Sequence, residues 1–598
     1  MSGKQNILQL KWIHTSDIHG YVFGDNRLRG DRIGGGALSV IHSYVRAQKE
    51  IYGEGVILSD GGDCLQGSPL VYYYNFVETN APHFIAEVMN EAGYDCGVMG
   101  NHDIEVGEKT FERWKNDCNF PILGANVIDK RTRKPYLQPF IIINRSGIKI
   151  AILGMVTSMI KYYQPNTLWP DLEYEEITDS AKRWIDVIQK QEHPDLLVGL
   201  FHSGYEGLFD VKGVCQENVV KNVAEQVPGF DLICYGHDHV PSVHRVKNIE
   251  GNEVVCMGST CSYGYFSAAD ITLTIQDGGI ISKSIDTKLL NIYKDIQISI
   301  NGIYTFENKF APQVQKAVEW ADMQLCQLTR PMHEQEAYFG PCLFMDYIHQ
   351  TQMNMTGAEI SFATPYSYNS RLNGKLKVRD IFPLLAYEEF VYSIKLTGEE
   401  IRKMIEMSYG KWINTIHSSA DNLISIYNYN KNANLIKKLK RIIKRLFITR
   451  TKVSNWRPVC PTSDMFTAAG VVYTVDVTKP VGKRVKIESM IDGSEFVEQQ
   501  YYKVAINRRL LFDKDGIIAK GAGLGQKDIP SRIISISEKA IPYYMMQQME
   551  MQKEVFPQLI SNWHFVPEEI VTKAIARDRE ILFPSNVIQE ISNNYFKI

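Results

Sequence analysis

The sequence predicts an α/β fold for the first half of the chain and a separate α+β domain for the second half. In the first 290 or so residues, short apolar runs end at turns that carry His, Asp or Asn, and helical patterns lie between them. Beyond about residue 331, helical and strand-like segments are mixed. The length of 598 residues suits two to four domains of ordinary size.

Five apolar runs in the first half predict strands. Each run leads directly into polar residues at a turn, and the runs are 8–13, 56–58, 96–99, 196–201 and 232–235. Helical spacing at 83–91 and 179–191 fills two of the intervals. Because ligand groups gather where the strands of an α/β sheet end, we expect the polar turns to lie together.

The second half begins after a predicted connecting helix. Apolar residues recur at helical spacing between Glu307 and Leu328, which indicates one long helix at a domain junction. We therefore predict a first domain over 1–300, a linker helix over 301–330 and a second domain over 331–598. In the second domain, the pattern favours a helix at 397–408 and strands at 470–477 and 502–507.

Composition and charge exclude several classes of protein. With 44% hydrophobic and 22% charged residues, the chain is neither collagen-like nor wholly disordered. A net charge of −3 gives no field that would attract a nucleic-acid polymer, so a nucleotide partner would be small. The ten cysteines include no C-x-x-C pair, which favours free, mostly buried thiols over disulfides or a zinc–thiolate site.

No apolar run approaches the roughly 20 residues of a membrane helix. The first ten residues also lack the apolar stretch of a signal peptide. As written, the chain is expected in the cytoplasm, and in the periplasm or outside the cell if a signal segment has been removed.

The polar turns carry a set of residues suited to two divalent metal ions. A bridged metal pair needs oxygen and imidazole ligands from several strands, and one carboxylate that touches both ions. Asp63, in a Gly-Gly-Asp turn, is the candidate bridging carboxylate. The complete candidate set is Asp17, His19, Asp63, Asn101, His202, His237 and His239. A single histidine of this kind is usually structural, but five such elements in one order favour a metal site.

In order along the chain, these motifs are D-x-H, G-D-x-x-Q-G, G-N-H-D, H-S-G and G-H-x-H. Together they resemble the calcineurin-like metallophosphoesterases, and within them the two-domain 5′-nucleotidase and 2′,3′-cyclic-nucleotide phosphodiesterase family. The resemblance implies an α/β sandwich of two mixed sheets flanked by helices, followed by a smaller α+β domain that reads the substrate. It also implies two divalent ions, of Mn, Zn, Fe or Co.

Carried over by position, the resemblance implies one ion among Asp17, His19, Asp63 and His239. The other ion would lie among Asp63, Asn101, His202 and His237. His102 matches the family's catalytic histidine, which stabilises charge on the phosphoryl group and helps the leaving oxygen depart.

Glu105 stands where the family more often has the Asp that orients this histidine. Asp103 is the alternative partner of His102, with Glu105 then a solvated loop residue.

The resemblance implies hydrolysis of nucleotide phosphoesters by a water that the metal pair activates. The 5′-nucleotidase branch usually has an Asn followed by a glycine-rich turn and an Arg, whereas residues 365–374 here read P-Y-S-Y-N-S-R-L-N-G, without the glycine-rich turn. Residues 406–414 are more similar to the cyclic-phosphodiesterase branch. Both substrates therefore stay open. Two alternatives are a pyrophosphate hydrolase acting on nucleotide sugars or dinucleotides, and a catalytically silent protein that binds nucleotide or metal.

Two aromatic residues are candidates for stacking on the nucleobase. The resemblance places Phe466 and Phe512 at the positions of the family's aromatic pair, with Tyr409 and Trp412 as weaker candidates. The alternative for each ring is ordinary packing in the core of the second domain.

One insertion, Leu435 to Phe447, has apolar residues on one helical face and Lys or Arg on the other. Such a helix suits weak contact with an anionic membrane or a partner. The interpretation we favour is a surface helix packed on its own domain.

Overall fold

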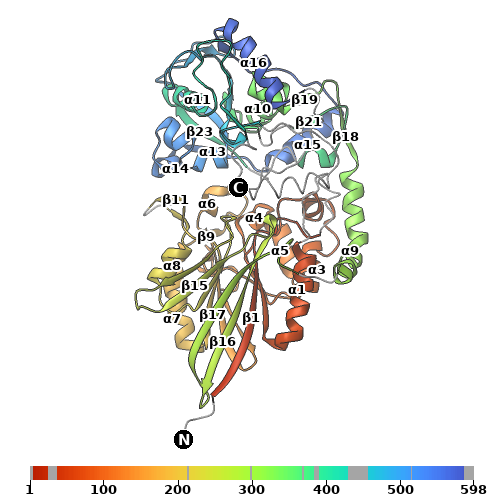
Figure 1. Cartoon of the computed structure of the whole chain (residues 1–598), viewed down its shortest axis with the longest axis vertical. Helices are drawn as coiled ribbons and strands as arrows, with labels where there is room; N and C mark the ends of the chain where they lie inside the picture. Colours follow the sequence, from red (N-terminus) through yellow and green to blue (C-terminus); the bar gives the residue numbers. More distant parts are fainter. Residues whose placement is uncertain are drawn as a thin grey trace. The chain divides into compact units, whose positions relative to one another are not determined.

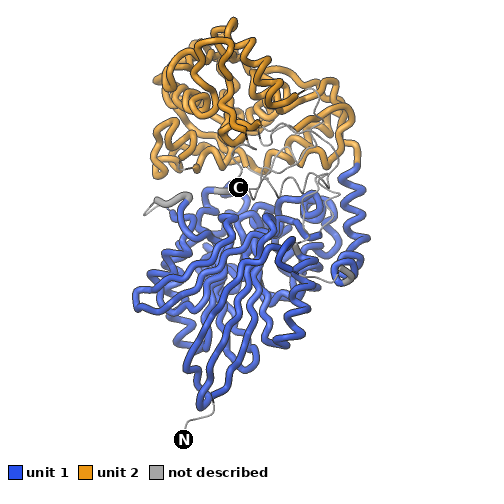
Figure 2. Tube along the Cα trace, viewed as in Figure 1, with its two compact units in different colours: residues 1–322 blue, residues 323–598 orange. Residues whose placement is uncertain are grey.

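The structure is a computed structural model of the chain, shown in Figure 1. It describes residues 5–23, 37–211, 215–296, 300–365, 370–382, 390–428, 456–513 and 515–584. The chain forms two compact units, residues 1–322 and 323–598 (Figure 2). The basic segment from Leu435 to Phe447 lies outside the described residues.

The first sheet of unit 1 has six strands in the order β17-β16-β1-β2-β3-β4. Strands β1 to β4 pair in parallel, and β16 and β17 extend the sheet in antiparallel fashion beside β1. The strands are β1 (Gln5–Thr15), β2 (Val56–Asp60), β3 (Cys96–Val98), β4 (Ile122–Leu123), β16 (Tyr265–Gln276) and β17 (Gly279–Asn291).

The second sheet of unit 1 also has six strands, in the order β14-β15-β13-β10-β8-β7. Its four central strands are parallel and its two edge strands antiparallel. The strands are β7 (Phe140–Arg145), β8 (Ile148–Val156), β10 (Leu196–His202), β13 (Leu232–Tyr235), β14 (Val243–Lys247) and β15 (Glu253–Gly258).

One apolar core joins the two sheets. It includes Trp12 and Ile57 from the first sheet and Ile152 and Val198 from the second, all at most 1% exposed. Such burial of both inner faces makes the sheets a sandwich. The predicted α/β sandwich is confirmed, and the ten cysteines are free, as predicted.

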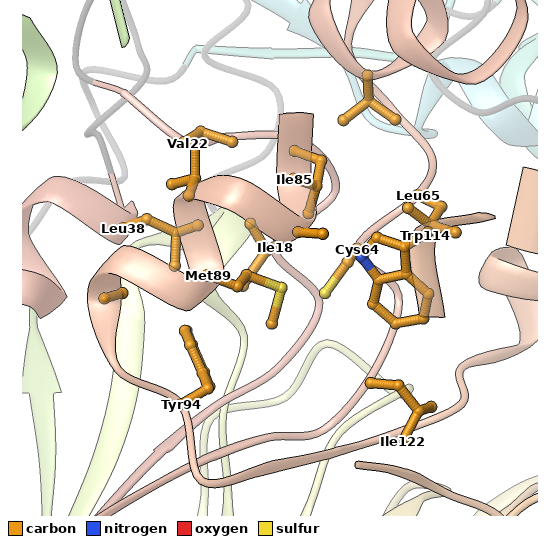
Figure 3. Packing of buried hydrophobic residues seen from close by; sticks show 14 of the residues in the cluster. Ile18, Val22, Leu38, Cys64, Leu65, Ile85, Met89, Tyr94, Trp114 and Ile122 are labelled. Carbon is orange, nitrogen blue, oxygen red and sulfur yellow. The ribbon is translucent and has the colours of Figure 1, made fainter. Parts of the chain in front are cut away.

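Helices cover the outer faces of the sandwich (Figure 1). A core cluster joins α1, α3 and α5 to the first sheet, and Figure 3 shows part of it, with Leu38, Ile85, Met89 and Trp114 turned inward. A second cluster joins α7 and α8 to the other sheet. These helices are α1 (Ala37–Tyr52), α3 (Phe84–Ala92), α5 (Glu108–Asp117), α7 (Ile177–Glu192) and α8 (Val220–Gln226).

Short elements complete unit 1. They are α2 (Pro69–Tyr72), α4 (Asn101–Glu105) and α6 (Ile160–Tyr163), the small sheet of β5 (Val127–Asp129), β6 (Lys134–Pro135) and β9 (Leu172–Tyr174), and the pair β11 (Gly207–Val211) and β12 (Cys215–Asn218).

The predicted linker helix over 301–330 was wrong at its end. Helix α9 (Ile300–Ala321) packs through Phe306, Phe310 and Ala317 into the core of unit 1. The following segment, Gln324–Leu328, is strand β18, which pairs with strands of unit 2. A short apolar run fits either periodicity, and here pairing with strands distant in sequence decided the outcome.

Unit 2 contains a five-stranded sheet in the order β26-β20-β29-β23-β30. Its strands are β20 (Ile360–Ala363), β23 (Val391–Thr397), β26 (Thr467–Ala469), β29 (Tyr501–Asn507) and β30 (Ile533–Ile536). Its helices are α10 (Leu343–Thr356), α11 (Gly398–Trp412), α13 (Arg508–Phe512), α14 (Ile529–Arg532), α15 (Ile541–Gln552) and α16 (Glu568–Leu582).

The remaining strands of unit 2 form smaller sheets. They are β18, β19 (Met332–His333), β21 (Arg371–Leu372), β22 (Lys375–Lys377), β24 (Ile426–Asn428), β25 (Trp456–Pro458), β27 (Val471–Asp476), β28 (Val485–Met490), β31 (Glu554–Val555) and β32 (Asn562–Val566). Within the described ranges, none of the helices is long and apolar enough to cross a membrane.

Candidate dinuclear metal centre

The seven predicted metal ligands come from the carboxyl ends of strands in both sheets of unit 1. Asp17 and His19 follow β1, Asp63 follows β2, and Asn101 opens α4 after β3. His202 is the last residue of β10, and His237 and His239 follow β13. Parallel strands end at the same edge of a sheet, and packing of the two sheets brings the two edges together.

Five of the seven side chains stand on left-handed backbone. The φ angles are 53° at Asp17, 48° at His19, 60° at Asp63, 84° at His237 and 56° at His239. Non-glycine residues seldom adopt this conformation, and it persists where surrounding contacts hold it. Here the turn after β1 is joined to the turn after β2, because Asp17 N donates to Gly62 O and His19 N donates to Asp63 O, both at 2.9 Å.

Two motif glycines allow the close approach of these turns. A Cβ on Gly100 would collide with the carboxylate and the backbone nitrogen of Asp63. A Cβ on Gly236 would collide with the Ser16 hydroxyl and the Asp17 carboxylate. The glycines of G-N-H and G-H-x-H are therefore required by the packing of one turn against another.

The first group of ligands contains Asp17, His19 and His239. Nε2 of His239 lies 3.4 Å from Oδ1 of Asp17 and 3.2 Å from Nε2 of His19. On its other side, Nδ1 of His19 lies 2.9 Å from Oε1 of Gln66. That contact makes Nδ1 the donor, so Nε2 of a neutral His19 turns its lone pair toward the group.

The second group contains Asp63, His202 and His237, with Asn101 between the two rings. Oδ1 of Asn101 lies 2.9 Å from Nε2 of His202 and 2.8 Å from Nδ1 of His237. Nδ1 of His202 donates to Gly61 O at 2.6 Å. Nε2 of His237 lies 3.0 Å from Oε1 of Glu217.

Asp63, a member of the second group, also lies beside the first. Its Oδ2 lies 3.1 Å from Nε2 of His202 and 3.9 Å from Nε2 of His19, and its Oδ1 accepts the backbone N–H of His102 at 2.8 Å. The side chain is 1% exposed. Its position between the two groups is the one required of a bridging carboxylate.

These donor sets fit divalent cations. In His19, His202 and His237, one ring nitrogen donates outward to an oxygen while the other faces the group. With these rings neutral, lone pairs of nitrogen and oxygen converge in two buried places, where a cation would remove their mutual repulsion. Imidazole, carboxylate and amide ligands suit Mn, Zn, Fe and Co, and do not single out one of them.

The histidines around Asp17 and Asp63 lower the pKa of both carboxyl groups. Burial opposes ionisation of Asp63, yet positive charge on His202 and His102 outweighs it and holds the pKa of Asp63 well below its usual range. For Asp17, burial is likewise outweighed by His239, and its pKa falls to about 2. Both carboxylates are therefore available as anionic ligands at neutral pH.

His102 and Glu105 lie beside the two groups. Nδ1 of His102 lies 2.6 Å from Oε2 of Glu105, and the His102 ring lies 5.5 Å from the ring of His19. Both side chains are less than 10% exposed. The contact places Glu105, rather than Asp103, against the His102 ring.

Asp103 has a different task. Its carboxylate accepts backbone N–H groups of Asp63, Cys64, Leu65 and Gly100 at 2.7–2.9 Å. It is fully buried, and it ties the turn that carries Asp63 to the turn that carries Asn101.

Replacing Asp103 with alanine is expected to destabilise unit 1. Four buried backbone donors would lose their acceptor, at about 1–3 kcal/mol for each donor that water does not reach. We expect a loss of about 3 kcal/mol or more in the free energy of unfolding, measured by urea denaturation of the metal-free protein. Asp103→Asn, which keeps one acceptor oxygen, is expected to lose less, and equal stability of all three proteins would refute this account.

The aromatic candidates of unit 2 are all buried. Phe466 is 2% exposed and its ring lies 6.3 Å from that of Phe362, while Phe512 is 8% exposed and its ring lies 5.8 Å from that of Tyr392. Tyr409 and Trp412 pack on one another and on Phe565. This burial favours the core-packing alternative for Phe466, Tyr409 and Trp412. Phe512 is slightly more exposed and remains a candidate for base stacking.

Comparison with known proteins matches both units. The family model of the calcineurin-like phosphoesterases matches residues 10–241, and that of the 5′-nucleotidase C-terminal domain matches residues 323–520. The chain is therefore a calcineurin-like phosphoesterase with a 5′-nucleotidase C-terminal domain. Calcineurin-like phosphoesterases use divalent metal ions, in agreement with the two donor groups.

Relatives that match nearly the whole of this phosphoesterase are distant in sequence. The trifunctional nucleotide phosphoesterase YfkN of Bacillus subtilis is 23% identical over 94% of the chain, which spans 39% of that protein. The 2′,3′-cyclic-nucleotide 2′-phosphodiesterase/3′-nucleotidase of Haemophilus influenzae is 22% identical over 94% of the chain and 88% of that protein. The structure of the Haemophilus influenzae NAD nucleotidase shares the fold, with a TM-score of 0.57 at 16% identity over 94% of the chain and 99% of that protein.

Sequence reasoning assigned no role to two residues that contact the ligands of this phosphoesterase. Gln66 lies in the quoted G-D-x-x-Q-G motif, and its fixed distance from Asp63 was an available signal. Glu217 had no such signal, because it lies in no motif and reaches His237 only through the fold.

Replacing Gln66 with alanine is expected to weaken the first metal group. Oε1 of Gln66 fixes the ring of His19, and loss of such a contact typically costs 10–100-fold in metal affinity. We expect one of the two bound Mn²⁺ ions to dissociate about 10–100-fold more readily, measured by calorimetric titration of the metal-free protein. An unchanged pair of dissociation constants would contradict the role of Gln66.

Proposed function

We propose that this chain hydrolyses nucleotide phosphoesters, as a 5′-nucleotidase, a 2′,3′-cyclic-nucleotide phosphodiesterase or both. The observation that carries the proposal is the pair of donor groups with Asp63 between them, and the His102–Glu105 pair beside them. A protein that only binds metal has no need of a histidine held against a carboxylate beside its ligands. The substrate class follows the names of the relatives in both units.

Two sets of residues in unit 1 would hold the metal ions used in hydrolysis. Asp17, His19, Asp63 and His239 would hold one divalent ion, and Asp63, Asn101, His202 and His237 the other. Bound there, the two ions would supply positive charge to the phosphoryl oxygens and a water of lowered pKa.

Glu105 holds His102 by its Nδ1–H and favours a protonated ring. Nε2 of His102 then presents a proton to a phosphoryl oxygen or to the leaving oxygen. No covalent phosphoenzyme is needed, since Ser203 of H-S-G is buried and donates its hydroxyl to Glu217 O.

Hydrolysis of a pyrophosphate bond in a nucleotide sugar or dinucleotide is a second candidate. It would use the same metal groups, and only the fold shared with the NAD nucleotidase favours it. The two reactions differ in product, because cleavage of a pyrophosphate yields two phosphate monoesters.

Product analysis tests the proposal. Mn²⁺-loaded protein would be incubated with 5′-AMP, 3′-AMP, 2′,3′-cyclic AMP and a dinucleotide, and the products separated by chromatography. Adenosine and phosphate from 5′-AMP, or an opened ring from the cyclic substrate, would support it, and chelation of the metal should abolish either activity. No turnover by protein that holds two ions would contradict it.

A further inference from the structure

The side chain of Glu217 lies against the outer edge of the second metal group. Its Oε1 is 3.0 Å from Nε2 of His237, and its side chain is 10% exposed. Nδ1 of the same ring is 2.8 Å from Oδ1 of Asn101 and therefore faces the group. A carboxylate at Nε2 requires a proton there, because a carboxylate only accepts hydrogen bonds.

Contacts from two other segments fix the backbone of Glu217. Its carbonyl oxygen accepts the hydroxyl of Ser203 at 2.8 Å and that of Thr157 at 3.1 Å. Ser203 also accepts the N–H of Val219 at 3.1 Å. The strand β12 is thus tied to the loop that begins at His202.

The residue after Glu217 adds a further contact. Gly204 N donates to Oδ1 of Asn218 at 2.9 Å, so the loop after β10 also holds Asn218. The serine of the H-S-G motif therefore has a structural use distinct from catalysis. It places Glu217 where its carboxylate meets His237.

We infer that Glu217 is a positioning residue for the second metal ion. By accepting the Nε2–H of His237, it keeps Nδ1 unprotonated and aimed at the group that contains Asp63, Asn101 and His202. It also places negative charge behind the imidazole, which strengthens the ring as a ligand. The inference rests on the proposed function, because it assumes that this group holds a metal ion.

The two groups differ in the residue that contacts the outward-facing nitrogen of a histidine ligand. In the first group, the outward nitrogen of His19 faces the neutral amide of Gln66, whereas in the second that of His237 faces a carboxylate. Loss of the Glu217 carboxylate should therefore affect one ion and leave the other in place.

Calorimetric titration of the metal-free protein with Mn²⁺ tests the inference. We expect Glu217→Ala to raise the dissociation constant of one ion about 10–100-fold and to leave that of the other ion within about twofold. Glu217→Gln, which keeps an acceptor oxygen without the charge, should lie between the wild type and Glu217→Ala. Glu206→Gln, at an exposed glutamate paired with Lys221, is the matched control and should bind as the wild type does.

Activity supplies a second readout. If Glu217 acts only by positioning His237, raising free Mn²⁺ to saturation should restore most of the kcat of Glu217→Ala. Wild-type affinity for both ions in Glu217→Ala, or an equal loss of both ions, would overturn the inference while leaving the proposed function intact. A wild-type protein that binds fewer than two ions would overturn both.

Discussion

Replacing Asp63 with asparagine is expected to lower kcat/KM by about 10³-fold or more, equivalent to about 4 kcal/mol of transition-state stabilisation. The Asp63 carboxylate lies between the two metal groups, with Oδ2 3.1 Å from Nε2 of His202 and 3.9 Å from Nε2 of His19. An amide keeps the size of the side chain but removes the negative charge that two adjacent cations share. Steady-state kinetics with the best nucleotide substrate measures the loss.

Metal content separates this effect from misfolding. Asp63→Asn should retain fewer than two ions per chain after dialysis, measured by elemental analysis. Asp60→Asn is the control variant for Asp63→Asn and should keep both ions. The Asp60 carboxylate accepts hydrogen bonds from Thr15, Gly62 and Cys64 and does not face the metal groups. Burial raises the pKa of Asp60 to about 7, so an uncharged amide resembles its protonated form near neutral pH. Equal activity of Asp63→Asn and the wild type would exclude the bridging role.

The His102→Ala variant is expected to lose about 10²–10⁴-fold in kcat while keeping both ions, as is typical for loss of a general acid. His102 lies outside both metal groups, and its Nδ1 is engaged by Glu105 at 2.6 Å. The ring therefore acts on the substrate rather than as a ligand. Measurement of kcat alongside metal content distinguishes the two roles, and loss of an ion from this variant would make His102 a ligand.

The leaving group then reveals what His102 does. If its proton goes to the leaving oxygen, His102→Ala should be impaired far less with a p-nitrophenyl phosphate ester, whose leaving oxygen needs no proton, than with a nucleotide. If the ring only neutralises phosphoryl charge, both substrates should suffer alike. Glu105→Gln should fall between His102→Ala and the wild type, since an amide oxygen still accepts Nδ1–H but no longer favours a charged ring.

Local signals in the sequence predicted five strands of unit 1 and the polar side chains that the structure brings together at their ends. The turns after 8–13, 56–58 and 96–99 each combine a buried strand with a polar residue, and parallel strands place such residues at one edge. The helix at the domain junction was predicted from periodicity, but its end was not. Gln324–Leu328 became strand β18 because it pairs with β22 and β31, which lie far along the chain.

The site shows the same division between what local sequence predicts and what the tertiary structure decides. By itself, the sequence determined which residue types could bind two cations, because Asp, Asn and His stand at fixed places within short motifs. Only the tertiary structure decided which nitrogen of each histidine faces inward, that Glu105 rather than Asp103 meets His102, and that Glu217 meets His237. The physical reason is that a motif fixes neighbours along the chain, whereas these contacts depend on backbone held by hydrogen bonds from distant segments.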